Sequence, residues 1–308
     1  MGEFHEAIIV GGGPAGLTAG IYLMRAGVDT LLIEKMIPGG APVYTERIEN
    51  YPGFPDSISG RELMSKFIAH AKAQGLVMKE FSEVEKISLK GEGFIIKTPD
   101  GQFESTGVIV TTGTEPAKMN VPGESKFLGM GVSYCATCDG AFFRDMDVAV
   151  IGGGDAAIEE GLFLANIVRK VYVIHRRDVL RAQKILQDRA FRNSKMEFLW
   201  NKKPVEVGGK DQVEYIVVED TKTGEHAKVE VSGVFVYIGS NPNTSFLGDL
   251  VERDDAGFVL TDDNLSTRTK GLFIAGDARK KALRQISTAV GDGALAAVNL
   301  ERYILEKR

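Results

Sequence analysis

The sequence predicts an α/β protein of two similar domains, the second of which is inserted into the first. Three repeated features predict this fold class. Residues 7–35 and 147–178 share one order of apolar run, glycine loop, helical pattern and second apolar run. Each is followed by a hairpin pattern, FIIKTPDGQFES or YIVVEDTKTGEHAKVEV, in which PDG and KTG are turn signals. Each hairpin leads to one more apolar run, VIVTTGTEP or VFVYIGSNP.

The first repeat has the pattern of a dinucleotide site. Its apolar run AIIV leads into Gly11-x-Gly13-x-x-Gly16, and its second apolar run ends in Glu34. Glycines at this spacing let the backbone approach a pyrophosphate at a helix N-terminus, and the carboxylate accepts a hydrogen bond from a ribose hydroxyl. The alternative is a plain glycine loop, but the strand, helix and acid around it favour a Rossmann-like domain.

The second repeat has the same design with Gly152-x-Gly154-x-x-Ala157. Gly11 and Glu34 are 23 residues apart, and so are Gly152 and His175 at the end of the second run. The identical register predicts a second Rossmann-like nucleotide-binding domain.

A basic group replaces the acid in the second repeat. His175, Arg176 and Arg177 stand where the first repeat has Glu34 and a lysine. Guanidinium groups bind a 2′-phosphate bidentately, whereas a carboxylate repels it. We therefore expect NADPH in the second site and a nucleotide with a free ribose in the first. Arg181 follows Arg177 by four residues, which on a helix would place both on one face. A solvated basic helix end is the alternative.

Two short segments mark where the chain crosses between the domains. Gly113–Pro116 and Gly239–Pro242 both have Gly, a small residue, any residue and Pro. The predicted first domain is residues 1–114 and 245–308, and the predicted inserted domain is 117–242.

The last piece of the first domain brings polar residues to the start of a helix. A strand pattern ends at Asp277, and an amphipathic helix pattern runs from about Ile286. Arg284 and Gln285 would put donors and a positive helix end beside a bound group, which suits a reduced, anionic flavin. Asp277 is placed to bind sugar-chain hydroxyls, and a helix cap is its alternative role.

Composition excludes several other classes of protein. The chain has 308 residues, 44% of them hydrophobic and 26% charged, with a formal net charge of −5. It lacks the basic footprint of a nucleic-acid binder and an apolar stretch long enough for a transmembrane helix. Glu3 and Glu6 stand where an export signal needs positive charge, so we expect a cytoplasmic protein without a membrane partner.

Four groups of motifs resemble the low-molecular-weight thioredoxin reductases. They are CATCDG, GGGDAAIEE with HRRDVLRA, ENYPGF, and GLFIAGDA with RQISTAVGDGALAA, in the right order from about residue 6 to the C-terminus. The resemblance implies FAD in the first domain, NADPH in the second, a homodimer and reduction of the disulfide of thioredoxin. It implies an FAD site that includes Gly11, Gly13, Ala15, Gly16, Glu34, Asn50, Asp277, Arg284 and Gln285. It implies an NADPH site that includes Gly152, Gly154, Ala157, His175, Arg176, Arg177 and Arg181, with Cys135 and Cys138 as the redox pair and Asp139 as the nearby acid.

Two positions depart from the pattern of that family. Ala41 stands where the family has Gln in its flavin loop, which removes one expected polar contact to FAD, and Pro42 follows it. Ile286 stands where the family tends to have Ala after Arg-Gln. Both changes flank the flavin and leave the NADPH motif and the thiols intact.

Cys135 and Cys138 are the only cysteines in the chain. A metal site needs two more ligands, and the four histidines are scattered without ligand spacing, which leaves only a half-site shared across a dimer. A structural disulfide would close too short a loop to stabilise much. The spacing favours a redox couple. The family places Cys138 on the flavin side and Cys135 on the substrate side, and Asp139 is expected to shuttle a proton to and from a thiolate, with a turn role as its alternative.

The expected reaction runs from NADPH through FAD and the Cys135–Cys138 pair to thioredoxin by thiolate exchange. A thioredoxin-like or glutaredoxin-like partner other than thioredoxin is one alternative, and an FAD dithiol oxidase that uses oxygen is another. An oxidase that uses oxygen would not need the NADPH motif HRRDVLR, so the presence of this motif argues against the oxidase. Because the nicotinamide and the cysteines share the inserted domain, yet both must reach the flavin, we expect rotation about a two-crossing hinge.

Overall fold

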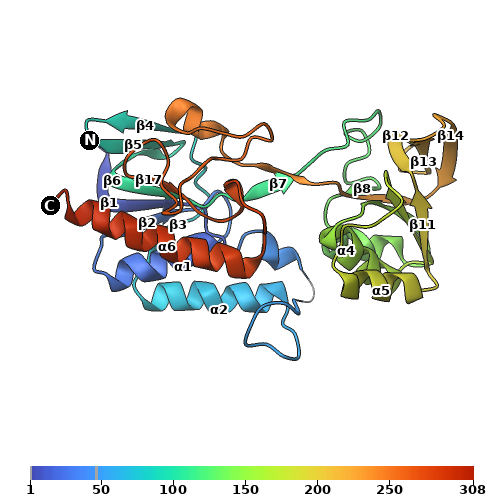
Figure 1. The fold of residues 1–308 in the computed structure, drawn as a ribbon, viewed down its shortest axis with the longest axis horizontal. Coiled ribbons are helices and arrows are strands. Elements are labelled where there is room, and N and C mark those ends of the chain that lie inside the picture. The colour runs from blue at the N-terminus through green and yellow to red at the C-terminus, as the bar shows by residue number, and fades with distance from the viewer. Residues whose placement is uncertain (1, 46–47) are drawn as a thin grey trace. The chain divides into compact units, whose positions relative to one another are not determined.

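The computed structural model describes residues 2–45 and 48–308. The chain divides into two compact units, which Figure 1 shows. Unit 1 is Met1–Glu115 with Asn241–Arg308, and unit 2 is Pro116–Ser240. Each unit is described by itself.

Unit 1 is built on a mixed sheet whose central part is parallel. Its strands lie in the order β3 (Val77–Lys79), β2 (Thr30–Ile33), β1 (Glu3–Val10), β6 (Gly101–Val110), β5 (Gly93–Thr98) and β4 (Lys86–Lys90), and β17 (Leu272–Ile274) pairs with β6. The pairs among β3, β2, β1, β6 and β17 are parallel. β4, β5 and β6 form the antiparallel part, so the first predicted hairpin is confirmed.

The two faces of this sheet are covered by different parts of the chain. Along β1, Ala7 and Ile9 belong to one buried cluster and Ile8 and Val10 to another, because successive side chains of a strand point to opposite faces. The first cluster holds α1 (Pro14–Arg25), α2 (Gly60–Ala73) and α6 (Ile286–Leu305) against the sheet, as Figure 1 shows. The start of α6 agrees with the predicted helix.

Unit 2 has a parallel sheet of the same kind. Its strands lie in the order β11 (Met196–Trp200), β10 (Lys170–His175), β9 (Asp147–Gly152), β15 (Gly233–Tyr237) and β8 (Val132–Ser133), all in parallel pairs. α4 (Asp155–Ala165) and α5 (Lys184–Arg192) belong to this unit. Strands β12 (Lys202–Gly208), β13 (Tyr215–Asp220) and β14 (His226–Glu230) form a separate antiparallel sheet that contains the second predicted hairpin. The prediction of an α/β fold with two Rossmann-like sheets is confirmed.

The two crossing segments pair with each other. β7 (Thr114–Pro116) and β16 (Ser240–Pro242) form a two-stranded ribbon. Ala117 N donates to Gly239 O at 2.9 Å, and Asn243 N donates to Gly113 O at 3.0 Å. The pairing runs antiparallel, so the chain leaves and re-enters unit 1 through adjacent strands.

One expected helical arrangement is wrong. The segment with Arg177 and Arg181 is a series of bends, and α5 begins only at Lys184. Arg181 N donates to Gly153 O at 2.7 Å, and Asp155 Oδ1 accepts from Gln183 N at 2.7 Å. These backbone groups are held by the glycine loop and α4 instead of by an earlier helical turn. Among the described residues, no helix has the length and apolar character needed to cross a membrane.

The core of unit 2 gives a test of stability. Phe235 is fully buried on β15 and packs edge-on against Phe143 with ring centroids 5.4 Å apart. We expect Phe235→Ala to lower the free energy of unfolding by about 3–5 kcal/mol, since it removes buried apolar area and leaves a cavity. Trp200 is the only tryptophan and lies in unit 2, so urea unfolding followed by its fluorescence reports this unit. Phe142→Ala is the control, since Phe142 is 75% exposed, and it should change stability by less than about 0.5 kcal/mol.

Candidate functional site

The three glycines of the Gly-x-Gly-x-x-Gly motif after β1 serve different physical needs. Gly11 has φ +107°, and a Cβ there would lie 2.7 Å from Thr111 O. A Cβ on Gly16 would lie only 1.9 Å from Gly11 O, so α1 reaches the strand end only without a side chain. A Cβ on Gly13 would meet nothing closer than Gly40 Cα at 3.9 Å. Gly13 therefore leaves open space at the N-terminus of α1, where a pyrophosphate group binds in this motif.

Glu34 is held at the carboxyl end of β2 by two backbone amides. Its Oε2 accepts from Gly12 N at 2.6 Å and its Oε1 accepts from Met36 N at 2.9 Å. The carboxylate thus has a fixed position beside the glycine loop, where its remaining lone pairs can accept from ribose hydroxyls.

Asp277 carries an unsatisfied buried oxygen in the turn after β17. Its Oδ1 is shielded from solvent and has no hydrogen-bond partner among the described residues, and its closest cation is Lys281 Nζ at 3.4 Å. Burial raises the pKa of Asp277, and Lys281 and Arg284 lower it in part. An orphaned carboxylate oxygen is what the hydroxyls of a flavin side chain would satisfy, so the residues here fit FAD.

The start of α6 gathers the other residues predicted for the flavin. Gln285 is the N-cap of α6, and its Oε1 accepts from Asn50 Nδ2 at 3.0 Å. Arg284 Nε donates to Asp277 O at 3.5 Å, and its guanidinium lies 3.8 Å from the centre of the Phe258 ring. Four residues predicted from separate motifs thus lie together.

Three further positions named in the sequence analysis, Ala15, Ile286 and Ala41, lie in unit 1. Ala15 lies on α1, where a Cβ on Gly276 would be 3.2 Å from its Cβ and a Cβ on Gly293 would be 2.2 Å from its carbonyl oxygen. Ile286 packs against the cluster of Ile48, Ile58 and Leu63, which accounts for an apolar residue at that position. Ala41 begins the short helix η1 (Ala41–Tyr44).

A buried charge network under this site escaped the sequence reasoning. Asp292 of α6 accepts from Arg279 through both oxygens at 2.9 Å, from Lys281 at 3.1 Å and from Gly276 N at 3.0 Å. Burial alone would raise the pKa of Asp292, but the two cations lower it below its ordinary value. The one signal in the sequence is an aspartate on the apolar face of a helix.

The glycine loop of unit 2 repeats the geometry of the first. Gly152 has φ +144°, and a Cβ there would lie 2.3 Å from Tyr237 O and 2.9 Å from Ala157 Cβ. A Cβ on Gly154 would meet nothing within 4 Å. Gly154 thus leaves space at the N-terminus of α4, as Gly13 does at α1.

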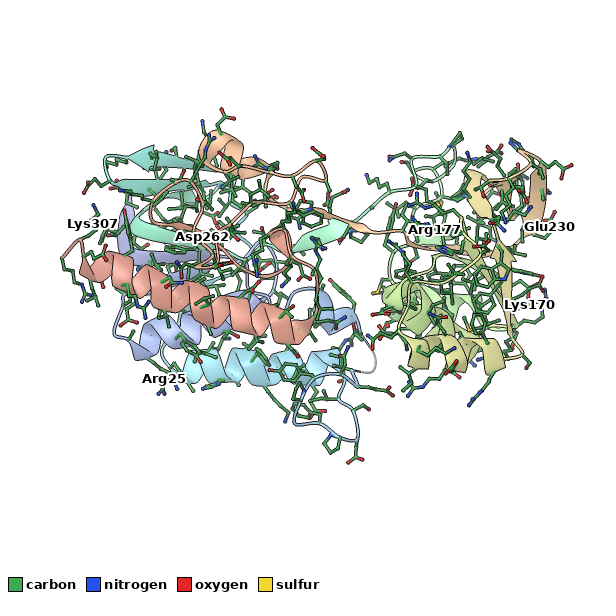
Figure 2. All side chains as sticks on the ribbon, in the orientation of Figure 1. Arg25, Lys170, Arg177, Glu230, Asp262 and Lys307 are labelled. Atoms are coloured by element: carbon green, nitrogen blue, oxygen red, sulfur yellow. A yellow bond between two sulfur atoms is a disulfide. The ribbon has the colours of Figure 1, made fainter. Side chains whose placement is uncertain are left out.

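The basic residues after β10 divide into one buried and three exposed groups. His175 is 5% exposed, lies under Gly153, and its Nε2 is 3.0 Å from Val179 O. Burial lowers the pKa of His175, so the imidazole is neutral at pH 7 and supports the glycine loop by packing against it. Arg176, Arg177 and Arg181 are exposed, and Figure 2 labels Arg177 in unit 2. Their guanidinium groups make no hydrogen bond or ion pair within the part of the chain that the structure describes, so they are available to an anion.

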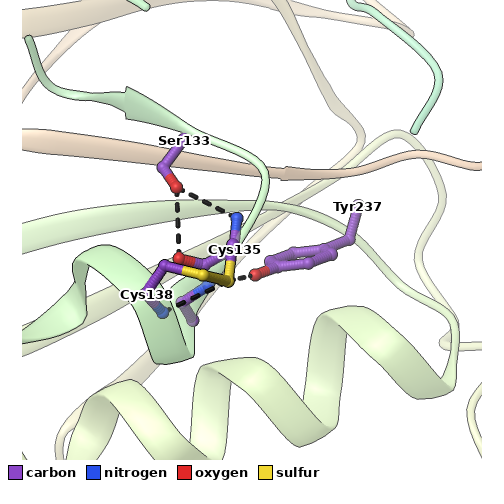
Figure 3. Close-up of a disulfide and its surroundings, with 5 residues drawn as sticks. Ser133, Cys135, Cys138 and Tyr237 are labelled. Carbon is purple, nitrogen blue, oxygen red and sulfur yellow. Dashed lines mark hydrogen bonds between the residues drawn. A yellow bond between two sulfur atoms is a disulfide. The ribbon is translucent and has the colours of Figure 1, made fainter. Parts of the chain in front are cut away.

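Cys135 and Cys138 form a disulfide at the N-terminus of the short helix α3 (Ala136–Asp139). As Figure 3 shows, Ser133 Oγ accepts from Cys135 N at 3.0 Å, and the hydroxyl of Tyr237 accepts from Ala136 N at 2.8 Å. Cys138 N donates to Cys135 Sγ at 3.2 Å. The sequence reasoning missed Ser133 and Tyr237, which hold the backbone of the motif.

The surroundings of the disulfide favour exchange with an outside partner. Cys138 is exposed, and Cys135 and Asp139 are partly buried. Asp139 ends α3 one residue after Cys138. Among the described residues, no group of three or more His, Cys, Asp and Glu side chains could hold a metal ion.

The sequence and the structure of this chain are similar to those of known proteins of one family. A family model described as pyridine nucleotide-disulphide oxidoreductase matches residues 5–293. The chain is 44% identical to a thioredoxin reductase of Bacillus subtilis over 99% of this chain and 96% of that protein. The crystal structure of thioredoxin reductase from Lactococcus lactis has 42% identity and a TM-score of 0.96, with 98% of this chain and 99% of that chain covered. The structure from T. acidophilum has 34% identity and a TM-score of 0.93, with 97% and 98% covered.

The glycine geometry predicts separable effects of two alanine substitutions. Gly13 has φ −78°, which alanine tolerates, and the added methyl would fill the open space before α1. We expect Gly13→Ala to fold but to bind flavin about 10- to 100-fold more weakly, as for the loss of one charge-assisted hydrogen bond. Flavin titration measures this, and thermal unfolding of the flavin-free protein should match the parent. Gly16→Ala should instead unfold at lower temperature, and equal thermal stability of the two variants would contradict this assignment.

Proposed function

The chain belongs to the pyridine nucleotide-disulphide oxidoreductase family as a thioredoxin reductase that uses NADPH and FAD, and we propose that Cys135 and Cys138 carry its electrons to thioredoxin. The disulfide between the only two cysteines, at an accessible helix end, carries this proposal. When bound, NADPH and FAD supply the two electrons that open the disulfide.

Cys135, Cys138 and Asp139 each have their own role in the thiol–disulfide exchange with the partner. Cys135 attacks the disulfide of the partner as a thiolate, and Cys138 displaces the partner by re-forming the Cys135–Cys138 bond. The N–H of Cys138, which points at Cys135 Sγ, stabilises negative charge on that sulfur. Asp139 holds or releases the proton of the Cys138 thiol, since general acid–base groups act at hydrogen-bond reach of the reacting atom.

Each unit is assigned one cofactor. Unit 1 would bind FAD, with the Gly13 gap at its pyrophosphate, Glu34 at its ribose, and Asp277 at its side chain. Unit 2 would bind NADPH at the Gly154 gap, with Arg176, Arg177 and Arg181 on the 2′-phosphate. Support comes from the open space at both glycines and from the unpaired state of the three guanidinium groups.

Assembly and location follow from the family. We propose a homodimer that acts in the cytoplasm, where a reducing environment suits a catalytic CxxC pair. Light scattering of the purified holoenzyme tests the assembly. NADPH oxidation with a panel of oxidised thioredoxins and glutaredoxins tests the partner, and activity with glutaredoxins alone would contradict thioredoxin as the substrate.

Cofactor choice is predicted to depend on the exposed arginines. Arg176→Ala or Arg181→Ala should lower kcat/KM for NADPH about 10- to 100-fold, because each loses a charge-assisted contact of about 1.5–3 kcal/mol. Activity with NADH should stay nearly unchanged, since NADH has no 2′-phosphate. Arg192→Ala is the control, because it removes an exposed arginine of the same unit. An equal loss with both nucleotides would mean that the arginines support the fold.

Substitution of the thiols should separate the two half-reactions. Cys138→Ser should allow NADPH to bleach the flavin but should abolish reduction of a protein disulfide. Cys135→Ser should do the same and leave a Cys138 thiolate for the flavin, which would show as a long-wavelength absorption band. Stopped-flow absorbance measures the first step and insulin precipitation with thioredoxin the second. Retained disulfide reductase activity in either variant would disprove the redox assignment.

A further inference from the structure

Glu160 is a partly buried carboxyl on α4, the helix that packs against the redox helix α3, and the steps above do not use it. Its Oε2 is shielded from solvent and has no hydrogen-bond partner in the described part of the chain. α4 packs against the motif, since Ala157 and Ile158 share a buried cluster with Ala136. A carboxyl oxygen that is shielded from solvent without a hydrogen-bond partner costs folding free energy, so its position calls for a role beyond stability.

Tyr237 connects this carboxyl with the redox helix. Its hydroxyl accepts the N–H of Ala136, which follows Cys135 directly. Burial raises the pKa of Tyr237, and the negative charges of Glu160 and Asp139 raise it further. The hydroxyl that contacts the motif therefore responds to the charge on Glu160.

The other charges around α4 leave Glu160 uncompensated. Burial raises the pKa of Glu160 to about 7, and the neighbouring Glu159 adds to the rise. No cation of the described residues offsets these effects. His175 on β10 is buried, and its pKa is lowered. Several charged groups on α4 and the elements packed against it have partners of their own: Asp147 with Arg169, Lys170 with Glu197, Lys184 with Asp188, and Asp155 with Gln183. Helix α5 also carries Arg189 and Arg192.

We propose that Glu160 is a positioning residue that binds a proton when the Cys135–Cys138 disulfide is opened and releases it when the disulfide re-forms. Opening the S–S bond with two electrons and one proton gives one thiol and one thiolate. The Glu160 carboxylate takes up a second proton from solvent, so the net charge around the pair stays constant. When the partner disulfide is reduced, the two electrons leave with the proton of the thiol, and Glu160 returns its own proton to solvent. The proposal rests on the assignment of the two cysteines as the redox pair.

The charge on the thiolate sets the direction of this coupling. A nearby negative charge makes a carboxylate harder to form, so reduction raises the pKa of Glu160 above its value in the disulfide form. Below both pKa values the acid is protonated in either state and resembles glutamine. Above both, it is ionised in either state and disfavours the thiolate. A shift of one pKa unit changes the equilibrium for reduction about tenfold.

The test compares the holoenzyme with its Glu160→Gln variant. Both are equilibrated with mixtures of reduced and oxidised dithiothreitol between about pH 5.5 and about pH 8.5, and the free thiols are alkylated and counted. Reduction by dithiothreitol releases the proton that the enzyme thiolate does not keep, and this release and the ionisation of dithiothreitol are common to both proteins and cancel in the ratio of their reduction constants. The reduction constant of the parent divided by that of the variant should be about 1 at the acid end and about 0.1 at the alkaline end. The tenfold change corresponds to a difference of about 30 mV between the reduction potentials of the two proteins.

Glu159→Gln is the matched control, since Glu159 is the exposed neighbour on the same helix. Removing its charge should move the fall in the ratio to lower pH without abolishing it. Infrared difference spectra of reduced minus oxidised parent protein should show a gain in the carboxylic-acid C=O band that Glu160→Gln lacks. A ratio that is constant over the pH range, even if displaced from 1, would overturn the coupling. The redox assignment itself fails only when a cysteine variant retains reductase activity, which is a separate result.

Discussion

Both units depend on how closely a helix can approach the end of a parallel strand. In unit 1 this approach requires Gly16, whose Cβ would overlap the carbonyl oxygen of Gly11, and in unit 2 it requires Gly152 beside the methyl group of Ala157. Because the helix begins so near the strand, its free N–H groups face the carboxyl edge of the sheet. Gly13 and Gly154 keep the space in front of those groups open. The proposed nucleotide sites of both units depend on this steric limit.

Much of this could be predicted from the sequence, because the informative signals are local. The two repeats, their hairpins and the start of α6 are encoded in nearby residues, and the structure has them where expected. The expected helix through Arg177 and Arg181 was wrong because Gly153 O captures the N–H of Arg181, a contact between segments 28 residues apart. The roles of Tyr237, Glu160 and Asp292 could not be predicted from the sequence for the same reason. Their roles depend on burial and on partners that are distant along the chain, which no single-sequence pattern records.

The two sites also differ in how they hold charge. In unit 1, Lys281 lies between Asp277 and a buried network in which Asp292 is neutralised by Arg279 and Lys281. In unit 2, Arg176, Arg177 and Arg181 stay exposed and have no ion-pair partner among the described residues, and burial raises the pKa of the partly buried Glu160. The first arrangement places a cation beside each acid. The second leaves its charge state free to change as ligands and electrons arrive, which suits the unit that carries the thiols.

The antiparallel ribbon of β7 and β16 has a consequence for how the protein is made. Unit 2 is one continuous segment whose two ends are already hydrogen-bonded together, so it can close its core as soon as residue 240 has left the ribosome. Unit 1 must wait, because β17 and α6 supply part of its sheet and the apolar face that covers α1. The later-encoded unit is therefore completed first, against the usual N-terminal-first order of synthesis. In the interval, the apolar face of α1 that α6 later covers stays exposed, and a chaperone could bind it.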